Sequence, residues 1–325
     1  MDSTLKDVAN ASGVSIRTVK RALSGARYVD SKTRDRILAV AARLAYEPNL
    51  AARALKTGRS SEIGVMLTSM DELFIGKLEA FERTLRPEGY SVHIFFAPAE
   101  TKAADVPEVA TALMARRPAG VGLFPDYLEV VASGVAERLN AAGIPTVVLD
   151  SRRDAPGDGV LVDRPQGVYE AVMYLTRTGR RRVAYLGPVS DRSRLDGYEK
   201  AMRELDQPPL LVPVHDNVEA AVAQLLSLQP RPDAVQTHSD VLAMDVLAAL
   251  HRRGVRVPEE MAVVGFDDRA FAALSWPKLT TVAQPNADVG AAGAEILLAR
   301  IAGRPAPNGR WVRSCPTRLV VRESA

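Results

Sequence analysis

Cysteine is nearly absent from this sequence. Its 325 residues contain one cysteine, Cys315, which leaves no partner for an internal disulfide and no set of thiolates for a metal site. The four histidines, His93, His215, His238 and His251, lack the spacing of metal ligands. We therefore expect no metal and no other cofactor, and we interpret Cys315 as a small apolar side chain in a core.

Long apolar runs and enzyme motifs are missing as well. No apolar run approaches the length that spans a bilayer, and the N-terminus, MDSTLKDVAN, lacks the apolar segment of a signal peptide. The sequence contains no nucleophile elbow and no phosphate-binding P-loop. GVGLFP, residues 120–125, resembles a dinucleotide fingerprint, but it ends in proline and its glycines lie inside an apolar run. The sequence thus predicts a cytoplasmic protein that is not an enzyme.

What is present is an uneven distribution of charge. Residues 1–60 contain 12 Lys and Arg against 5 Asp and Glu, whereas the remaining residues contain 30 against 34. A basic segment ahead of a mildly acidic remainder predicts that the segment binds a nucleic acid or an anionic membrane surface. Because 47% of the residues are hydrophobic, the chain can form two or three cores.

The basic segment has the pattern of three helices. Thr4 and Asp7 stand at capping-box spacing, and Gly13 ends the first helix. SKTRDRILAVAARLAY predicts a third helix that Pro48 ends, with Ile37, Leu38, Ala41 and Leu44 facing the core. Residues 49–60 are a weakly apolar stretch that we expect to become helical only when a partner holds it.

VSIRTVKRALSG, residues 14–25, supplies the second helix after a tight turn, and this arrangement is typical of a helix-turn-helix. Ser15 caps its start, Gly25 ends it, and Val19, Ala22 and Leu23 have the spacing of a buried stripe. The opposite face carries Ile16, Arg17, Lys20, Arg21 and Ser24. Surface helices usually mix charges of both signs, so a face with cations alone suits a polyanion, although a merely solvated basic face has the same pattern.

The rest of the chain alternates apolar runs with helical stretches. The apolar runs are IGVMLT, YSVHIFFA, GVGLFP, PTVVLD, RVAYLG, DAVQTH and MAVVGFDD, and the helical stretches include VPEVATALMARR, EVVASGVAERLNAAG and DVLAMDVLAALHRRG. This many strand–helix units predict an α/β core of two doubly wound parallel-sheet domains. Ligands of such sheets bind at the carboxyl ends of the strands, where the sequence places Asp126, Asp150, Ser239, Asp240, Asp267 and Asp268. An aspartate at such a position can also merely cap the next helix.

Several separated motifs, in order, resemble one family. TLKDVANASGVSIRTVKRALSG, LAYEPNLAARALKTGRS, VPEEMAVVGFDD and LTTVAQP resemble the lactose/galactose repressor family of bacterial transcription regulators. The resemblance implies an all-α helix-turn-helix head at 1–47, a hinge helix at 48–60 that folds on operator DNA, and a periplasmic-binding-protein-like core. One core subdomain would span 61–160 plus about 286–312, and the other 161–285 plus about 313–325. A homodimer that binds a palindromic operator and a small-molecule effector, and no membrane, is also implied.

The same resemblance assigns DNA contacts. Arg21 is expected to donate two hydrogen bonds to a guanine, Arg17 to read a neighbouring base and Ile16 to contact a thymine methyl group. Lys20 stands where the family more often has a small residue, so it contacts a phosphate or alters the base preference. The phosphate-contact candidates are Ser15, Thr18, Ser24, Ser31 and Thr33. In the hinge, Leu55 is the expected minor-groove wedge, with Asn49 and Ala52 beside it.

The expected effector contacts are Phe74, Asp126, Asp150, Arg194, Ser239 and Asp267. Carboxylates and a guanidinium at this place can bind vicinal hydroxyls with paired hydrogen bonds, so a sugar is the first expectation. A sugar acid, a sugar phosphate or a nucleobase acting as corepressor is the alternative, and a stand-alone sugar-binding protein is a third. Three further arginines, Arg152, Arg153 and Arg164, admit an acidic or phosphorylated effector.

Overall fold

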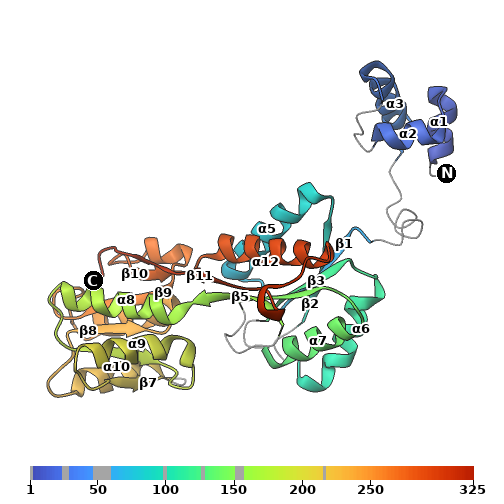
Figure 1. The fold of residues 1–325 in the computed structure, drawn as a ribbon. Coiled ribbons are helices and arrows are strands. Elements are labelled where there is room, and N and C mark those ends of the chain that lie inside the picture. Colours follow the sequence, from blue (N-terminus) through green and yellow to red (C-terminus); the bar gives the residue numbers. More distant parts are fainter. Residues whose placement is uncertain are drawn as a thin grey trace. The chain divides into compact units, whose positions relative to one another are not determined.

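The structure is a computed structural model that describes residues 3–23, 29–46, 60–97, 101–125, 129–150, 157–214 and 217–325. The chain separates into two compact units, Met1–Ser61 and Glu62–Ala325 (Figure 1). The described part of the smaller unit is helical, and the larger unit contains two sheets. No helix in the described ranges is both long enough and apolar enough to cross a membrane.

Three short helices lie in the described part of the smaller unit: α1 (Leu5–Ser12), α2 (Ile16–Leu23) and α3 (Ser31–Arg43). The expected capping box is present, because the Thr4 hydroxyl accepts a hydrogen bond from the Asp7 N–H, and the Asp7 carboxylate accepts one from the Thr4 N–H at 2.8 Å. Gly13 ends α1 in the left-handed conformation, with φ 67°. The buried core draws on all three helices and comprises Val8, Ala9, Val19, Ala22, Val29, Ile37, Val40 and Ala41.

Two details of α3 differ from the expectation. The helix ends at Arg43 rather than at residue 46, because Ala45 takes a left-handed conformation with φ 45° and the Tyr46 N–H bonds to the carbonyl of Ala41. Leu38 is 44% exposed, and Val40 fills the core instead. Gly25, Pro48 and residues 49–59 lie outside the described residues, so the end of the second helix and the hinge helix stay predictions.

The first sheet of the larger unit has the strand order β11-β5-β4-β3-β1-β2, and all its neighbouring strands are parallel. The strands are β1 (Glu62–Leu67), β2 (Ser91–Phe96), β3 (Gly120–Phe124), β4 (Thr146–Leu149), β5 (Asp158–Asp163) and β11 (Val312–Pro316). Helices α5 (Glu72–Leu85) and α12 (Asn286–Ile301) cover one face, and α6 (Val106–Ala115) and α7 (Glu129–Ala141) cover the other (Figure 1). We call these elements the first lobe.

The second lobe is built around the sheet with the order β12-β10-β9-β8-β6-β7, in which β12 alone is antiparallel to its neighbour. The strands are β6 (Val183–Gly187), β7 (Leu211–Pro213), β8 (Ala234–Thr237), β9 (Ala262–Asp267), β10 (Thr280–Ala283) and β12 (Arg318–Val320). Its two faces are covered by α8 (Arg164–Arg177) with α9 (Arg192–Glu204), and by α10 (Val218–Ser227) with α11 (Asp240–Arg252). Each sheet is thus buried on both faces, as predicted for doubly wound domains.

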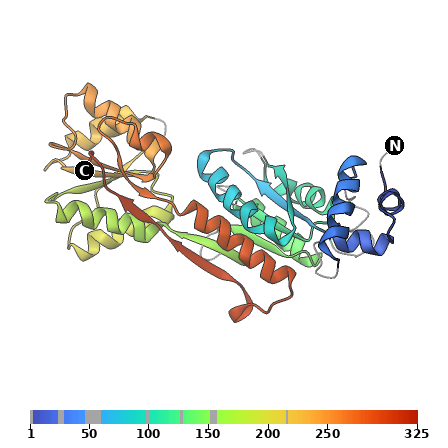
Figure 2. The same cartoon turned by 90° about the horizontal axis from the view of Figure 1, so that it is seen from above.

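The chain passes between the lobes three times, from β5 to α8, from β10 to α12 and from β11 to β12 (Figure 2). Because β11 pairs with β5 along its whole length, the first lobe extends to Asp163 and Pro316, a few residues beyond the expected boundaries at 160 and 312. The parallel strands β5 and β10 both end at a crossover. The carboxyl ends of both sheets therefore lie on the side where the two lobes meet.

Candidate functional site

The exposed face of α2 combines cations with one large aliphatic side chain. The Ser15 hydroxyl accepts a hydrogen bond from the Thr18 N–H at 3.1 Å, which caps the helix as expected, and the two hydroxyl oxygens are 2.8 Å apart. Val19 and Ala22 are buried, and this orientation leaves Ile16, Arg17, Lys20 and Arg21 exposed. Guanidinium groups beside an aliphatic side chain are the pair that reads guanine edges and thymine methyl groups in a major groove.

The start of α3 carries an acidic cap beside two of the phosphate-contact candidates. The Asp30 carboxylate accepts from the Thr33 N–H at 2.9 Å, and this bond holds the pKa of Asp30 below its usual value. Ser31 is exposed and Thr33 is half-buried. Ser24, Asn49, Ala52 and Leu55 lie outside the described residues, so their DNA contacts stay predictions.

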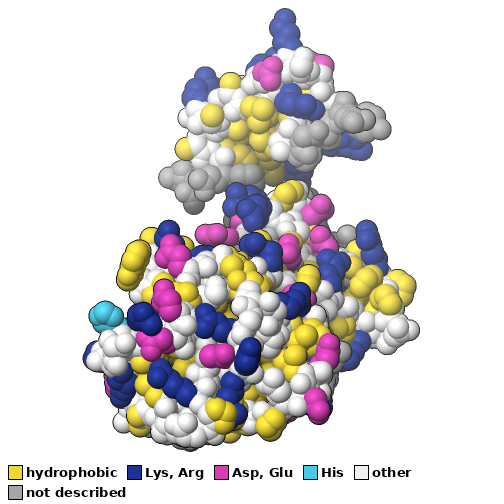
Figure 3. Space-filling view, turned by 90° about the vertical axis from the view of Figure 1, so that its left-hand side faces the viewer, with side chains coloured by type: hydrophobic (Ala, Val, Ile, Leu, Met, Phe, Trp, Pro, Cys, Tyr) yellow, Lys and Arg dark blue, Asp and Glu magenta, His cyan; other side chains and the backbone are white. Residues whose placement is uncertain are grey.

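The larger unit does not share the basic character of α2. On the face shown in Figure 3, its Lys and Arg side chains are interspersed with Asp and Glu side chains. This mixture agrees with the 30 basic and 34 acidic residues beyond residue 60. A polyanion is therefore attracted to α2 rather than to the balanced surface of the lobes.

A second group of polar residues connects the lobes at the carboxyl ends of their strands. We call it the interlobe cluster: Lys77, Asp150, Arg164, Asp191, Arg194, His238, Asp267 and Gln284. A continuous series of hydrogen bonds runs from Lys77 in α5 of the first lobe to His238 after β8 of the second. Four of the expected or noted positions, Asp150, Arg164, Arg194 and Asp267, thus belong to one network.

The first-lobe end of the cluster is a carboxylate between two cations. Lys77 Nζ donates to Asp150 Oδ2 at 2.5 Å, and the Arg164 guanidinium donates to both Asp150 oxygens at 2.6 Å. Burial opposes ionisation of Asp150, but the positive charges of Arg164 and Lys77 outweigh it and hold the pKa of Asp150 well below its usual range. Asp150, with φ 61°, follows directly on β4 and presents its side chain to both cations. Its two oxygens are therefore occupied by protein donors.

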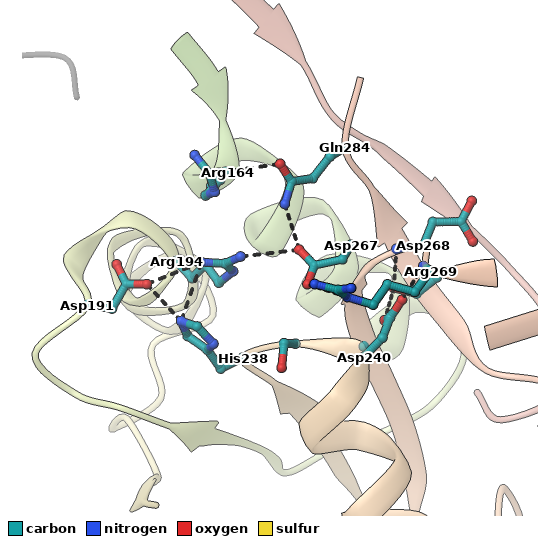
Figure 4. Close-up of polar contacts among 12 residues, drawn as sticks. Arg164, Asp191, Arg194, His238, Asp240, Asp267, Asp268, Arg269 and Gln284 are labelled. Carbon is teal, nitrogen blue, oxygen red and sulfur yellow. Dashed lines mark hydrogen bonds and ion pairs between the residues drawn. The ribbon is translucent and has the colours of Figure 1, made fainter. Parts of the chain in front are cut away.

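The second-lobe end of the cluster is centred on Asp267, the last residue of β9 (Figure 4). Asp267 Oδ1 accepts from Gln284 Nε2 at 2.6 Å and from Arg194 Nη2 at 3.3 Å, and Gln284 Oε1 accepts from Arg164 Nη2 at 3.3 Å. The φ of Asp267 is 121°, a value that L-residues rarely adopt. Strain of this kind persists where the surroundings fix a side chain for a binding role.

Arg194 organises the far end of the cluster. Its Nη1 donates to Asp191 at 3.2 Å, its guanidinium lies 4.5 Å from the centre of the Phe266 ring, and its Nε has no hydrogen-bond partner among the described residues. His238 Nε2 lies 2.7 Å from Asp191 Oδ2. Burial opposes ionisation of Asp191, but bonds from His238 and Ser193 and the charge of Arg194 lower its pKa. The arrangement offers a ligand a fixed cation, carboxylates and an imidazole within one small region.

A separate contact also joins the lobes. Arg269, which follows β9, donates from Nη2 to Asp71 Oδ2 at 2.8 Å, and the neighbouring Ala270 N–H donates to Glu72 at 3.2 Å. Asp71 is also the N-cap of α5, where its Oδ1 accepts from two backbone N–H groups. We call Arg269, Asp71 and Glu72 the interlobe clasp. A change in the angle between the lobes has to alter these contacts.

Comparisons with known proteins agree with this division into a helical head and two lobes. Residues 4–49 match the family described as bacterial regulatory proteins, lacI family, and residues 172–325 match the periplasmic binding protein-like domain. The transcriptional regulator RegA of Clostridium saccharobutylicum is 30% identical over 311 residues, which cover 92% of each protein. The chain belongs to the lacI family.

Solved structures that are similar to this member of the lacI family include a regulator bound to DNA and regulators bound to small ligands. The lac repressor dimer bound to operator and the anti-inducer ONPF is 27% identical, with a TM-score of 0.84, and the match covers 100% of this chain and 99% of that one. The regulator CelR in complex with cellobiose is 26% identical, with a TM-score of 0.68 and coverage of 99% and 100%. The predicted fold class and the predicted DNA-binding transcription regulator are both confirmed.

Two of the expected effector residues, Phe74 and Ser239, make contacts within their own lobes. Phe74 is 5% exposed and packs in the core of the first lobe, with Lys77 Nζ 5.0 Å from its ring centre. Ser239 is the N-cap of α11, where its hydroxyl accepts from the Leu242 N–H at 3.3 Å. Asp126 lies outside the described residues. Their effector contacts stay predictions.

Asp240 does not cap α11, because Ser239 occupies the N-cap position. It is fully buried and accepts from the Arg269 N–H at 2.8 Å and from the Thr281 hydroxyl at 2.5 Å. Asp240 thereby fixes the backbone of the residue that reaches across to the first lobe. Burial raises the pKa of Asp240 to about 7, and the neighbouring Asp267 and Asp268 charges add to the shift.

The cluster contains residues that the sequence pattern did not single out as contacts. Lys77 occupies a position of the buried stripe of α5, between Phe74 and Phe81. A lysine in such a stripe needs a charged partner, so the sequence alone could have indicated a buried ion pair here. Gln284 stands inside the LTTVAQP motif, but only the path of β10 shows that it reaches Asp267. Asp191 of the cluster and Arg269 of the clasp lie in loops and bond to His238 and Asp71, which are distant in sequence, so no local pattern reveals these contacts.

Proposed function

We propose that this regulator is a homodimeric repressor of carbohydrate-related genes whose operator affinity is controlled by a small molecule bound at the interlobe cluster. It acts on a palindromic operator in the cytoplasm and has no enzymatic activity. The observation that carries the proposal is the pair of features on one chain: a cationic α2 face on a helix-turn-helix, and a strained, buried, hydrogen-bonded cluster where two doubly wound lobes meet.

The DNA-binding half of the proposal rests on α2. Its exposed face carries Arg17, Lys20 and Arg21 and no acidic residue, and Ile16 is 42% exposed beside them. Contact with water does not stabilise an exposed isoleucine side chain, whereas contact with a thymine methyl group would bury its apolar surface. Arg21 and Arg17 then read base edges, and the Ser15 and Thr18 hydroxyls contact phosphates.

The dimer is supported by apolar side chains that a monomer leaves in water. Trp276 is 90% exposed and Leu274 is 84% exposed in the second lobe, and Ile94 and Phe96 on the edge strand β2 are 50% and 46% exposed. Exposed patches of large apolar residues mark association surfaces. A two-fold dimer would bury them and would present two heads to the two halves of a palindrome.

The effector half of the proposal rests on Arg194 and Asp267. A guanidinium and a carboxylate held 3.3 Å apart can bind neighbouring hydroxyls of a sugar, and the complex of the similar regulator CelR with cellobiose supports a carbohydrate ligand. A ligand that binds one angle between the lobes better than another shifts the population of the two arrangements. Operator affinity would change by a coupling free energy of about 1–3 kcal/mol.

Selection of genomic DNA fragments tests this function directly. The purified protein is incubated with fragments of the source genome at about 150 mM salt, and the retained fragments are sequenced. We expect enrichment of a palindrome next to genes of carbohydrate uptake or use. The variant Arg21→Ala should lose the enrichment, whereas Arg43→Ala, which removes an exposed cation at the end of α3, should keep it. Recovery of random fragments by the wild-type protein would contradict sequence-specific regulation.

A further inference from the structure

We propose that the effector carries an anionic group, a carboxylate or a phosphate, and that Arg164 is the residue that binds this group. The inference rests on the proposed function, because it concerns the ligand of the interlobe cluster. It goes further by naming the charge of the effector and the side chain that selects for it.

The charges at the first-lobe end of the cluster do not balance. Asp150 is the one carboxylate that contacts Lys77 and Arg164, so among the described residues this group carries an excess of one positive charge. The side chains of Lys77, Asp150 and Arg164 are only 2%, 10% and 17% exposed. Burying two cations against a single carboxylate is costly, and a ligand that supplies a second negative charge would offset this cost.

The positive excess at this end depends on Lys77, whose position in the buried stripe of α5 is otherwise suited to an apolar side chain.

The two cations approach Asp150 in different ways. Lys77 is almost completely buried and reaches Asp150 from inside the first lobe, whereas Arg164 reaches both Asp150 oxygens from the second lobe. Arg164 is the most exposed of the three and extends toward Gln284 and Asp267 (Figure 4). Three hydrogen bonds involve its guanidinium, so two of its five N–H donors have no partner among the described residues. Arg164 is thus the donor that an anion can reach.

The second-lobe end of the cluster is richer in carboxylates. Asp191 and Asp267 share Arg194, Arg269 Nε lies 3.9 Å from Asp267 Oδ2, and the remaining acceptor sites on these carboxylates suit hydroxyl donors. An effector with an anionic end and several hydroxyls would therefore bind in one orientation, with its anion at Arg164 and its hydroxyls toward Asp267. A neutral sugar would donate its hydroxyls to the carboxylates but would supply no anion to Arg164.

Small anions test the proposal without knowledge of the effector. The thermal midpoint of the full-length protein is measured against potassium phosphate and, separately, potassium acetate, each compared with potassium chloride of equal ionic strength. We expect a saturable rise with at least one of the two anions, and the more effective one indicates whether the effector is a phosphate or a carboxylate. The variant Arg164→Gln should weaken this response about tenfold or more, as expected for the loss of a charge-assisted bond.

Phosphate can also bind the basic head, so the variants decide the result. A rise that is equal in wild type and Arg164→Gln, or no saturable rise with either anion, would overturn the proposal. Selection of an operator by the same wild-type preparation would still support the regulator, so the two conclusions fail separately.

Lys77→Met gives an independent test. Removing the second cation lets Asp150 neutralise Arg164, so this variant should have a higher midpoint than wild type without anions and a weaker anion response. Lys200→Met, which removes an exposed lysine above Tyr169 in the second lobe, should change neither. A lower midpoint with an unchanged anion response would mean that Lys77 is only a structural partner of Asp150, and the proposal would be wrong.

Discussion

Arg269 Nη2 lies 2.8 Å from Asp71 Oδ2, although the two residues belong to different lobes and are 198 positions apart in the chain. Each residue also serves its own lobe, because Asp71 caps α5 and the backbone of Arg269 is held by Asp240. The clasp therefore couples a helix start in the first lobe to a strand end in the second. An effector that changes the angle between the lobes therefore either breaks or strengthens the bond between Arg269 and Asp71.

A double-mutant cycle measures the strength of the clasp. Asp71→Asn preserves the helix cap, since asparagine is a good N-cap, while Arg269→Gln removes the charge that crosses the lobes. We expect a coupling free energy of about 0.5–1 kcal/mol in urea unfolding, because both side chains are partly exposed. The same cycle on operator affinity should also show coupling.

Arg192 and Glu199 provide the matched control pair. Both lie on α9 in the second lobe, 2.7 Å apart, so their cycle can affect stability but not the contact between the lobes. Coupling in operator affinity for Arg192 and Glu199, or none for Arg269 and Asp71, would argue that the clasp has no part in control.

Much of the fold follows from local patterns. All seven predicted apolar runs form strands, and the three quoted helical stretches form α6, α7 and α11. The strands that the sequence did not reveal are β5, β7, β10, β11 and β12. β7 and β12 have three residues each, and β11 has a mostly exposed sequence, VRSCP, because it lies at a sheet edge. The other four strands, β5, β10, β11 and β12, stand at the crossovers between the lobes, and these crossovers decide their pairing more than their own periodicity does.

The site was only half predictable for a related reason. Asp150, Arg194 and Asp267 are visible as polar residues at strand ends or in quoted motifs, but the partner that decides the role of Asp150 is Lys77, 73 residues away. A carboxylate that is free to bind hydroxyls and one that is occupied by two cations have the same local sequence. The effector contact expected at Asp150 stays a prediction, and the structure adds Lys77 and Arg164 as its partners within the protein.

Arg21 tests how α2 recognises DNA. Arg21→Ala should weaken binding to the selected operator by about 1–3 kcal/mol and relax the preference at one base pair of each half-site. The measurement is a titration of operator variants and of random DNA at fixed salt. If binding to random DNA falls by the same factor, Arg21 contacts a phosphate and the base assignment is wrong.

Asp267 tests the response to the effector. Asp267→Asn removes the negative charge of the carboxylate to which Arg194 and Gln284 donate. The size of the side chain hardly changes, and asparagine tolerates unusual φ values. If the effector is an inducer, we expect a reporter strain with the selected operator to remain repressed but to lose its response to the effector. Asp268→Asn is the control, since Asp268 pairs with Arg322 at 2.6 Å instead, and it should keep the response. A normal response of Asp267→Asn would place the effector elsewhere.

The raised pKa of Asp240 predicts an unusual dependence of stability on pH. Burial raises its pKa from 3.8 to about 7, so between these values the folded protein retains a proton that the unfolded chain has lost. The free energy of unfolding should therefore fall as the pH rises from about 4 to about 7, by an amount on the order of 4 kcal/mol, and this contribution should be constant above pH 7. Asp150 and Asp191 have lowered pKa values and act in the other direction, below about pH 4.

Asp240→Asn isolates this contribution. An asparagine resembles the protonated acid, because its amide can donate to the Thr281 hydroxyl while its oxygen accepts from the Arg269 N–H. We expect the slope between pH 4 and 7 to disappear in this variant and to persist in Asp196→Asn, which changes an exposed carboxylate on α9. Both tryptophans, Trp276 and Trp311, lie in the larger unit, so fluorescence-detected urea unfolding reports on the lobes alone. Equal slopes in Asp240→Asn and wild type would show that Asp240 ionises normally, and the backbone of Arg269 would then be held by a charged carboxylate at all physiological pH values.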